Sequence, residues 1–489
     1  MNRSFIVEEV FPVAASSATF AALTAPLQAY RQALYASFAE RGDAQMELID
    51  ALLSTPDATA VVELSLSPSF RRHYSNIGRA IAAGTPRGTR REHVQQVWGL
   101  IAPYLPRPQR HFWLLGHDAT SCPRPFARTL RDRGVVYLPN AVCDNKPVTL
   151  GHQYEALLLL PEKPAPRTPP WVVPLAFPRI PTGETEVQVA AELLNAALGD
   201  TQLPWGQDLV VDVGDGRYTT VAFLAAVHPR ANLVTITRAR SNCVFYRPYQ
   251  APPDAPPRRG APPRYGARWA LHEPATWGPP DQTTHYPHTT ARGRTYTVVS
   301  EAWEGLIMHG KRGQRMWDKP FTLVRLRALD AAGQEVFRRP LWLVVLGTRR
   351  GELTLRETAD AYAHRGDAEH FNRFAKQDLL FSHYQTPDTQ HEENWATCVQ
   401  VAYTQLWLMR GLVRQLPRPW EQYLPQPPAG LATPSQTQRD AARILRQIGT
   451  PAQAPQSRGK SAGRPPGTQP PRRPRLAVVK KGKKRAPTA

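Results

Sequence analysis

The sequence is poor in cysteine, in acidic residues relative to basic ones, and in long apolar runs. Its four cysteines are scattered, with no CxxC pair: Cys122, Cys143, Cys243 and Cys398. A structural zinc site or a disulfide framework is therefore not expected. No apolar stretch approaches the roughly 18 residues of a membrane span, and Glu8 and Glu9 interrupt the apolar start of the chain, unlike a signal peptide. We expect a soluble protein of the reducing cytoplasm, with no membrane partner.

Basic residues outnumber acidic ones. The chain has 61 lysines and arginines against 40 aspartates and glutamates, which gives a net charge of +21 and a pI near 10.2. A charge so far from neutral indicates a polyanionic partner, most simply nucleic acid. The 50 prolines concentrate in the middle of the chain and at its C-terminal end. With 489 residues, the chain is long enough for roughly two to four domains and a large core.

The first part of the chain, residues 1–108, has the apolar periodicity of helices. Residues 26–39 carry apolar side chains at helical spacing, and a further helix is expected over about 91–105. We expect a helical domain in this region. Its role is open between DNA binding and a helical scaffold with a charged surface.

Two apolar runs further along the chain each lead to an aspartate. The bulky run 111–115 is typical of a buried strand, and it delivers Asp118 at its C-terminal edge. The β-branched run 209–213 predicts a second buried strand, followed by a glycine-containing turn. Asp212 lies within this strand and Asp215 in the turn after it, so either could be the second acid.

The stretch 362–376 reads YAHRGDAEHFNRFAK. On a helix that advances about 100° per residue, Tyr362, Arg365, Glu369 and Lys376 fall within roughly 60° of one another. A carboxylate flanked by two cations fits a place where a metal ion and phosphate oxygens meet. The alternative is a solvated amphipathic face with incidental salt bridges.

The beginning and the middle of this helical stretch have their own signals. Residues 354–357 have the form of a capping box, which predicts that a helix begins there. Gly366 predicts a break between two helices, because glycine inside a helix costs about 1 kcal/mol relative to alanine.

The spacing of Tyr362, Arg365, Glu369 and Lys376 resembles the Y-R-E-K signature of a large group of bacterial insertion-sequence transposases. These are DDE enzymes with a ribonuclease-H-like core, and the resemblance implies two upstream aspartates at strand ends. The catalytic and metal-binding carboxylates would then be Asp118, Asp215 and Glu369. Asp215 is preferred to Asp212 because a glycine and an aromatic residue follow it, as is typical of the group.

The resemblance also implies cofactors and partners. The three carboxylates would hold two Mg²⁺ ions, for which Mn²⁺ could substitute. The substrate would be double-stranded DNA, both the inverted repeats at transposon ends and the target, bound by a homodimer on paired ends. Residues 1–108 would recognise those ends. The core residues expected to contact DNA are Tyr362, Arg365, Lys376, Arg238 and Arg240, the last two at the exit of a strand over 233–237.

Together these features predict an α/β protein, with a ribonuclease-H-like mixed sheet flanked by helices. The long gap between Asp215 and Glu369 is typical of a β-rich insertion, in which Trp303, Trp317 and Trp342 either pack in the core or stack on a DNA base. The expected parts are 1–108, helical and DNA-end-binding; 109–245, the first part of the catalytic core; 246–350, the Pro-rich loop and insertion; 351–416, the last core helices; and 417–489, a Pro-rich, basic and disordered tail.

The tail is rich in basic residues and is expected to bind nucleic acid without sequence preference, by counterion release. A short helix is possible within it, around 438–448. Gly463-Arg464-Pro465 resembles an element that enters the minor groove of A·T-rich DNA. The tail residues assigned to DNA are Arg464, Arg472, Arg473, Lys480 and Lys481. The alternative is a tail that only solubilises the protein.

We therefore expect a transposase that cuts DNA at the ends of an insertion sequence and joins them to target DNA. It would act in the bacterial cytoplasm, at the nucleoid. Two alternatives remain open: a metal-dependent nuclease without strand transfer, and a non-catalytic DNA-binding protein derived from a decayed transposase.

Overall fold

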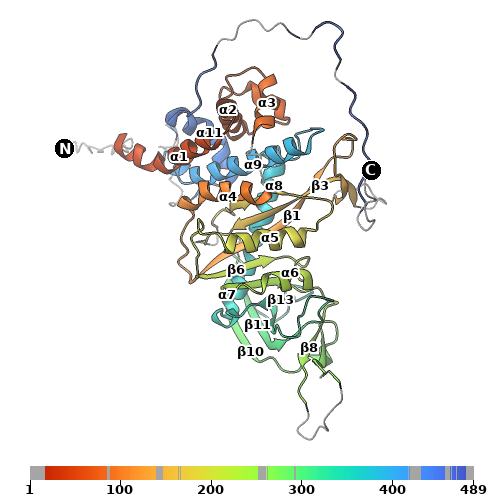
Figure 1. Cartoon of the computed structure of the whole chain (residues 1–489). Helices are drawn as coiled ribbons and strands as arrows, with labels where there is room; N and C mark the ends of the chain where they lie inside the picture. The colour runs from red at the N-terminus through yellow and green to blue at the C-terminus, as the bar shows by residue number, and fades with distance from the viewer. Residues whose placement is uncertain are drawn as a thin grey trace, which may run out of the picture.

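The computed structural model describes residues 17–84, 89–138, 147–163, 165, 167–251, 260–261, 263–290, 293–416, 418, 431–456, 463, 465–469 and 471–480. A large mixed sheet runs through the molecule, with most helices gathered at one end and the strands of the central insertion at the other (Figure 1). This is the α/β class that the sequence predicted, a mixed sheet flanked by helices. No helix in these residues has the length and apolarity needed to cross a bilayer.

The central strands follow the order β10-β11-β12-β13-β7-β6-β1-β3-β2, with β4 and β5 paired to β3. β1 lies inside the sheet, because it pairs antiparallel with β3 and parallel with β6. The strands of the core are β1 (Phe112–Pro123), β2 (Gly134–Tyr137), β3 (Val148–Leu159), β4 (Val173–Ala176), β5 (Arg179–Ile180), β6 (Leu209–Gly214) and β7 (Leu233–Arg238). Every residue of β6 is buried, as expected for a parallel strand covered on both faces.

The insertion continues the same sheet, because β13 pairs antiparallel with β7. Its strands are β8 (Val244–Pro248), β9 (Tyr265–Ala270), β10 (Gln282–Thr289), β11 (Thr295–Leu306), β12 (Phe321–Leu329) and β13 (Leu341–Leu346). β8 and β9 form a separate two-stranded sheet. Trp303 and Trp342 lie 5.6 Å apart in a buried cluster with Trp269, which agrees with the core-packing interpretation of these two rings. Trp317 instead holds Arg264 over its face, at 4.5 Å.

Different helices cover the two faces of the central sheet. One face carries α5 (Glu186–Leu198) and α6 (Val221–Val227), and the other carries α7 (Leu355–Ala363) and α8 (Gly366–Gln377) (Figure 1). The capping box predicted for 354–357 is confirmed, since the Thr354 and Glu357 side chains each bond the other's backbone N–H. The predicted break is confirmed too, with α7 ending at Ala363 and α8 beginning at Gly366.

The N-terminal helices pack around a long helix from the end of the core. This helix, α9 (Thr389–Met409), contacts α1, α2 and α3, while α4 packs on β4. The N-terminal helices are α1 (Ser17–Ser37), α2 (Gly42–Ser54), α3 (Ser75–Ala83) and α4 (Arg90–Ile101). Arg31 on α1 crosses this interface, because its guanidinium donates to both Asp50 on α2 and Gln405 on α9. The shared core joins the start of the chain to the helices that follow the insertion.

The region 417–489 was expected to be disordered, and this prediction is wrong for part of it, because the region contains a packed helix. Helix α11 (Pro434–Ile448) packs between α2 and α9. It buries Ala441 with Ile444 and Leu445, three and four residues further on, and its N-cap Thr433 accepts from the backbone of Gln436. Further along, Leu476 and Val479 donate backbone hydrogen bonds to the loop after β1, to the carbonyls of Arg128 and Arg133. Arg464 and Lys481 lie outside the described residues.

A buried polar cluster ties α9 to the sheet. Glu392 on α9 accepts hydrogen bonds from Arg124 at 3.0 Å and from Tyr154 at 3.0 Å, and its other contact is His152 Nδ1 at 2.8 Å. Arg124 lies directly after β1, and Tyr154 and His152 lie on β3. All four side chains are buried, so each depends on the others for its hydrogen bonds.

We expect Glu392→Gln to lower the free energy of unfolding by about 3–5 kcal/mol, because it leaves the buried charge of Arg124 uncompensated. Chemical denaturation followed by circular dichroism measures this. Glu393→Gln is the matched control: its half-exposed carboxylate pairs with Arg179 and should cost about 1 kcal/mol or less. Equal losses for the two variants would contradict a special role for the buried cluster.

Candidate active site

The pleat of the sheet separates the two candidate aspartates of the second strand. β1 and β6 run parallel, with Leu115 opposite Asp212 and Gly116 opposite Val213. Because side chains alternate between faces, Asp118 and Asp215 share the face of Gly116 and Val213. Asp212 points to the other face, where its Oδ2 lies 3.1 Å from Nε2 of His117, and both side chains are fully buried.

Helix α8 brings Glu369 to the face that holds Asp118 and Asp215. Asn372, one turn after Glu369, donates a 2.9 Å hydrogen bond to Asp118. Arg365, one turn before Glu369, forms an ion pair with it. Glu369 is half exposed, whereas the Arg365 side chain is mostly buried. The three carboxylates therefore approach one another from β1, from the turn after β6 and from α8.

Electrostatics show how closely these groups interact. Burial raises the pKa of Asp118 to about 6, and the negative charges of Asp215 and Glu369 act in the same direction. The hydrogen bond from Asn372 and the charge of Arg365 oppose this shift but do not cancel it. A carboxyl whose pKa is raised in this way lacks enough positive charge around it. A cation would satisfy it.

The other signature residues and two arginines surround the carboxylates. Burial raises the pKa of Tyr362, while the charges of Arg365 and Arg238 lower it. Burial lowers the pKa of Lys376, and the charges of Cys122 and Asp118 act against that shift. The Arg240 side chain lies along the turn after β6, 3.5 Å from the place of a Cβ on the glycine that follows Asp215. The structure thus gathers every core residue of the expected site.

The tail residues lie elsewhere. Arg473 donates to the carbonyl of Pro387 at 3.4 Å, and Arg472, Arg473 and Lys480 are exposed. Their expected role in DNA binding stays a prediction that is separate from the site.

Asp118, Asp215 and Glu369 have the chemistry of ligands for a divalent metal ion, but in this structure they are too far apart to share one. Carboxylate oxygens are the ligands that Mg²⁺ prefers, and the raised pKa of Asp118 marks unbalanced negative charge. Among the described residues, however, no three acidic, histidine or cysteine side chains lie close enough to share one ion. Arg365 supplies the positive charge on Glu369 instead. Because Glu369 is half exposed, turning it from Arg365 towards an ion costs little.

Sequence reasoning missed two parts of this arrangement. Asn372 holds Asp118, and a signal for it was present: it follows Glu369 by three residues, on the same face of the helix. Behind the site, Tyr218 stacks on His117 at 4.4 Å and donates to Glu155 at 2.8 Å. This buried polar layer has no signal in the sequence, because its members come from three separate strands and a turn.

The comparison with protein families decides the class of the chain. The model of the DDE superfamily endonucleases matches residues 33–303, more than half of the chain. The chain belongs to this family. The match contains β1 with Asp118 and the turn with Asp215, and it ends before Glu369. No curated protein matches the chain. A DDE superfamily endonuclease is a transposase-like nuclease that acts on DNA, and such enzymes generally use divalent metal ions.

We expect Asp118→Asn to stabilise the metal-free endonuclease at pH 7 but not at pH 4. Because the pKa is near 3.8 in the unfolded chain and about 6 in the folded protein, stability is lost as the pH rises from about 4 to 6. Removing the charge recovers at most about 3 kcal/mol. Thermal unfolding with a chelator at both pH values measures this. Asp57→Asn, at an exposed site, is the control, and a gain of the same size at pH 4 would contradict the explanation.

Proposed function

We propose that this DDE superfamily endonuclease is a transposase of the Y-R-E-K group, which cuts DNA at the ends of an insertion sequence and joins them to target DNA. The observation that carries the proposal is the approach of Asp118, Asp215 and Glu369 from three separate elements to one face of the sheet. Arg365 lies among them. Two Mg²⁺ ions, or Mn²⁺ in their place, would be held by these three carboxylates.

The protein's own residues have distinct tasks in this proposal. Bound divalent ions would supply charge stabilisation for the attacking and leaving oxygens of a phosphodiester. Asn372 keeps Asp118 in one orientation through its hydrogen bond. Arg365 releases Glu369 and, with Lys376, holds phosphates of the bound strand. Tyr362, whose pKa is raised by burial and lowered in part by the charges of Arg365 and Arg238, contacts the backbone near the cleaved end.

Exposed cations would bind the parts of the DNA that lie outside the cleavage site. Arg238 and Arg240 lie at the exit of β7, beside the carboxylates, and are exposed. The N-terminal helices would recognise the transposon ends, the basic tail would bind DNA without sequence preference, and a homodimer would hold paired ends. A nuclease without strand transfer is the second candidate, favoured by the endonuclease family itself. It would need no paired ends.

We expect Glu369→Gln to abolish cleavage of labelled DNA that carries the element's own ends, in the presence of Mg²⁺. The substitution removes the charge of one carboxylate and keeps its size. Glu352→Gln is a matched control, because Glu352 is also half exposed and also paired with an arginine of its own helical turn, Arg349. It should cut like wild type.

Four results would separate the candidate functions and test the site. Cutting and joining by wild type but not by Glu369→Gln supports the transposase, and cutting without joining supports the nuclease. If Glu369→Gln cuts as well as wild type, the assignment of the site is wrong. If wild type binds the ends without cutting them, the protein is a DNA-binding product of a decayed element.

We expect Asp215→Asn and Asp212→Asn to separate chemistry from stability. Asp215→Asn should lose cleavage with little change in the unfolding temperature, because Asp215 is half-buried at the site. Asp212→Asn should unfold at a lower temperature, because His117 loses its charged neighbour, but should retain cleavage below that temperature. The opposite pattern would make Asp212 the second catalytic carboxylate.

A further inference from the structure

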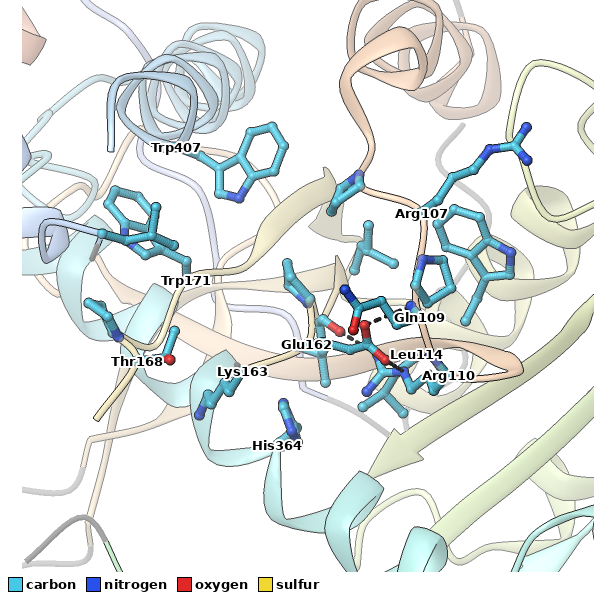
Figure 2. Close-up of a pocket in the computed structure, with 18 of the residues that line it drawn as sticks. Arg107, Gln109, Arg110, Leu114, Glu162, Lys163, Thr168, Trp171, His364 and Trp407 are labelled. Atoms are coloured by element: carbon cyan, nitrogen blue, oxygen red, sulfur yellow. Dashed lines mark hydrogen bonds and ion pairs between the residues drawn. The ribbon is translucent and has the colours of Figure 1, made fainter. Parts of the chain in front are cut away.

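A cavity lies apart from the cluster of carboxylates. It has a volume of about 490 Å³ and opens between the chain entering β1, the chain leaving β3, the end of α7 and the end of α9. Trp407 and Trp171 lie on one side of it and Arg107 on the other, with Glu162 and Arg110 below Arg107 in the view (Figure 2). The volume is within the range of sites for small organic ligands.

The decisive residue of this cavity is Arg410, at the end of α9. Its guanidinium lies 3.9 Å from the centre of the Trp407 ring and donates to the Trp407 carbonyl. It makes no ion pair with any residue in the described part of the chain, and burial lowers its pKa to about 10. A largely buried guanidinium without a counter-ion is costly, so an anion in the cavity would relieve it.

Other groups around the cavity have unused capacity for an anion. The buried indole Nε1 of Trp407 has no hydrogen-bond partner within the described residues. Arg110 donates to the carbonyls of Phe112 and Leu160, but its ion pair with Glu162 is long, at 3.9 Å, and burial lowers its pKa to about 10. Lys163 is paired with Asp367 at 2.7 Å, and Arg107 is exposed at the rim. The cations thus outnumber the nearby carboxylates.

The remaining lining is apolar or uncharged. Burial, with the charges of Lys163 and Arg110, lowers the pKa of His364 to about 4, so this ring is neutral at pH 7. Tryptophan, proline and leucine side chains complete the walls. A ligand that suits such a cavity carries negative charge at one end and a flat, weakly polar body at the other.

We propose that this cavity binds the phosphate of a nucleotide, with Arg410 as its principal partner and the nucleotide's base against the apolar wall. The site is separate from the proposed cleavage site and does not depend on it. Glu369 is one of the three carboxylates and pairs with Arg365, whereas His364 lines the cavity and Asp367 pairs with Lys163 of its lining. Positions 367 and 369 are about 200° apart on a helix. The phosphate could belong to a free nucleotide or to a DNA strand that passes the cleavage site.

Calorimetric titration of the full-length protein tests this. Three probes are used: inorganic phosphate, deoxyadenosine monophosphate and a single-stranded hexanucleotide. Arg410→Met keeps the aliphatic part of the side chain and removes its charge, and should weaken binding of the mononucleotide about tenfold or more, the loss expected for a charged hydrogen bond. Arg414→Met is the control for non-specific attraction, because Arg414 is exposed one turn further along, where it donates to Gln436. It should bind like wild type.

Two further readouts distinguish binding from folding and identify the ligand. Arg410→Lys keeps the charge and should bind more tightly than Arg410→Met, and without ligand Arg410→Met should unfold at a temperature no lower than wild type. Loss in Arg410→Met with the mononucleotide supports a free nucleotide, and loss only with the hexanucleotide supports a DNA strand. Equal binding by all variants, no binding by wild type, or inorganic phosphate binding as tightly as the nucleotide would overturn the proposal.

Discussion

Asp118 is repelled by the charges of Asp215 and Glu369, and the central part of the structure holds the elements that carry these three carboxylates in place despite this. β1 is paired on both sides, by β3 and by β6, so Asp118 cannot move away from Asp215 without breaking the sheet. Helix α8 cannot withdraw Glu369 easily, because Phe371 and Ala375 on its opposite side are fully buried. Arg365 and Asn372 offset part of the repulsion. The pKa of Asp118 stays raised because burial and the remaining repulsion outweigh these two interactions.

The other face of the sheet supports the same strands with a second layer of polar groups. His117 and Asp212 meet there between β1 and β6, and Glu155 on β3 accepts from Tyr218. Burial raises the pKa of Glu155 well above its ordinary value, and the hydrogen bond from Tyr218 opposes this shift. Alternation along each strand thus places two sets of acids on opposite faces of the sheet. The acids on the α8 face are those of the proposed cleavage site, and those behind them are packed between strands.

The sequence predicted features that depend on local pattern and missed those that depend on distant packing. The helix break at Gly366 and the capping box at Thr354 follow from neighbouring residues, and the structure has both. The buried strand predicted over 111–115 is present too, but β1 continues to Pro123, so Asp118 lies within the strand and not at its edge. A helix around 438–448 was predicted and α11 confirms it, but its packing against α2 and α9 does not follow locally. The joining of the insertion to β7 likewise depends on pairing between distant segments.

The distribution of positive charge separates attraction of DNA from chemistry on it. Exposed cations, such as Arg238 and those of the tail, would attract DNA through solvent, where salt screens charges within about 8–10 Å and would weaken that attraction steeply. Arg365 and Arg410 are largely buried, where screening is weaker and a bound phosphate has little water to compete with. Salt therefore acts mainly on how much DNA is held, and less on what the buried cations do with a phosphate once it has entered.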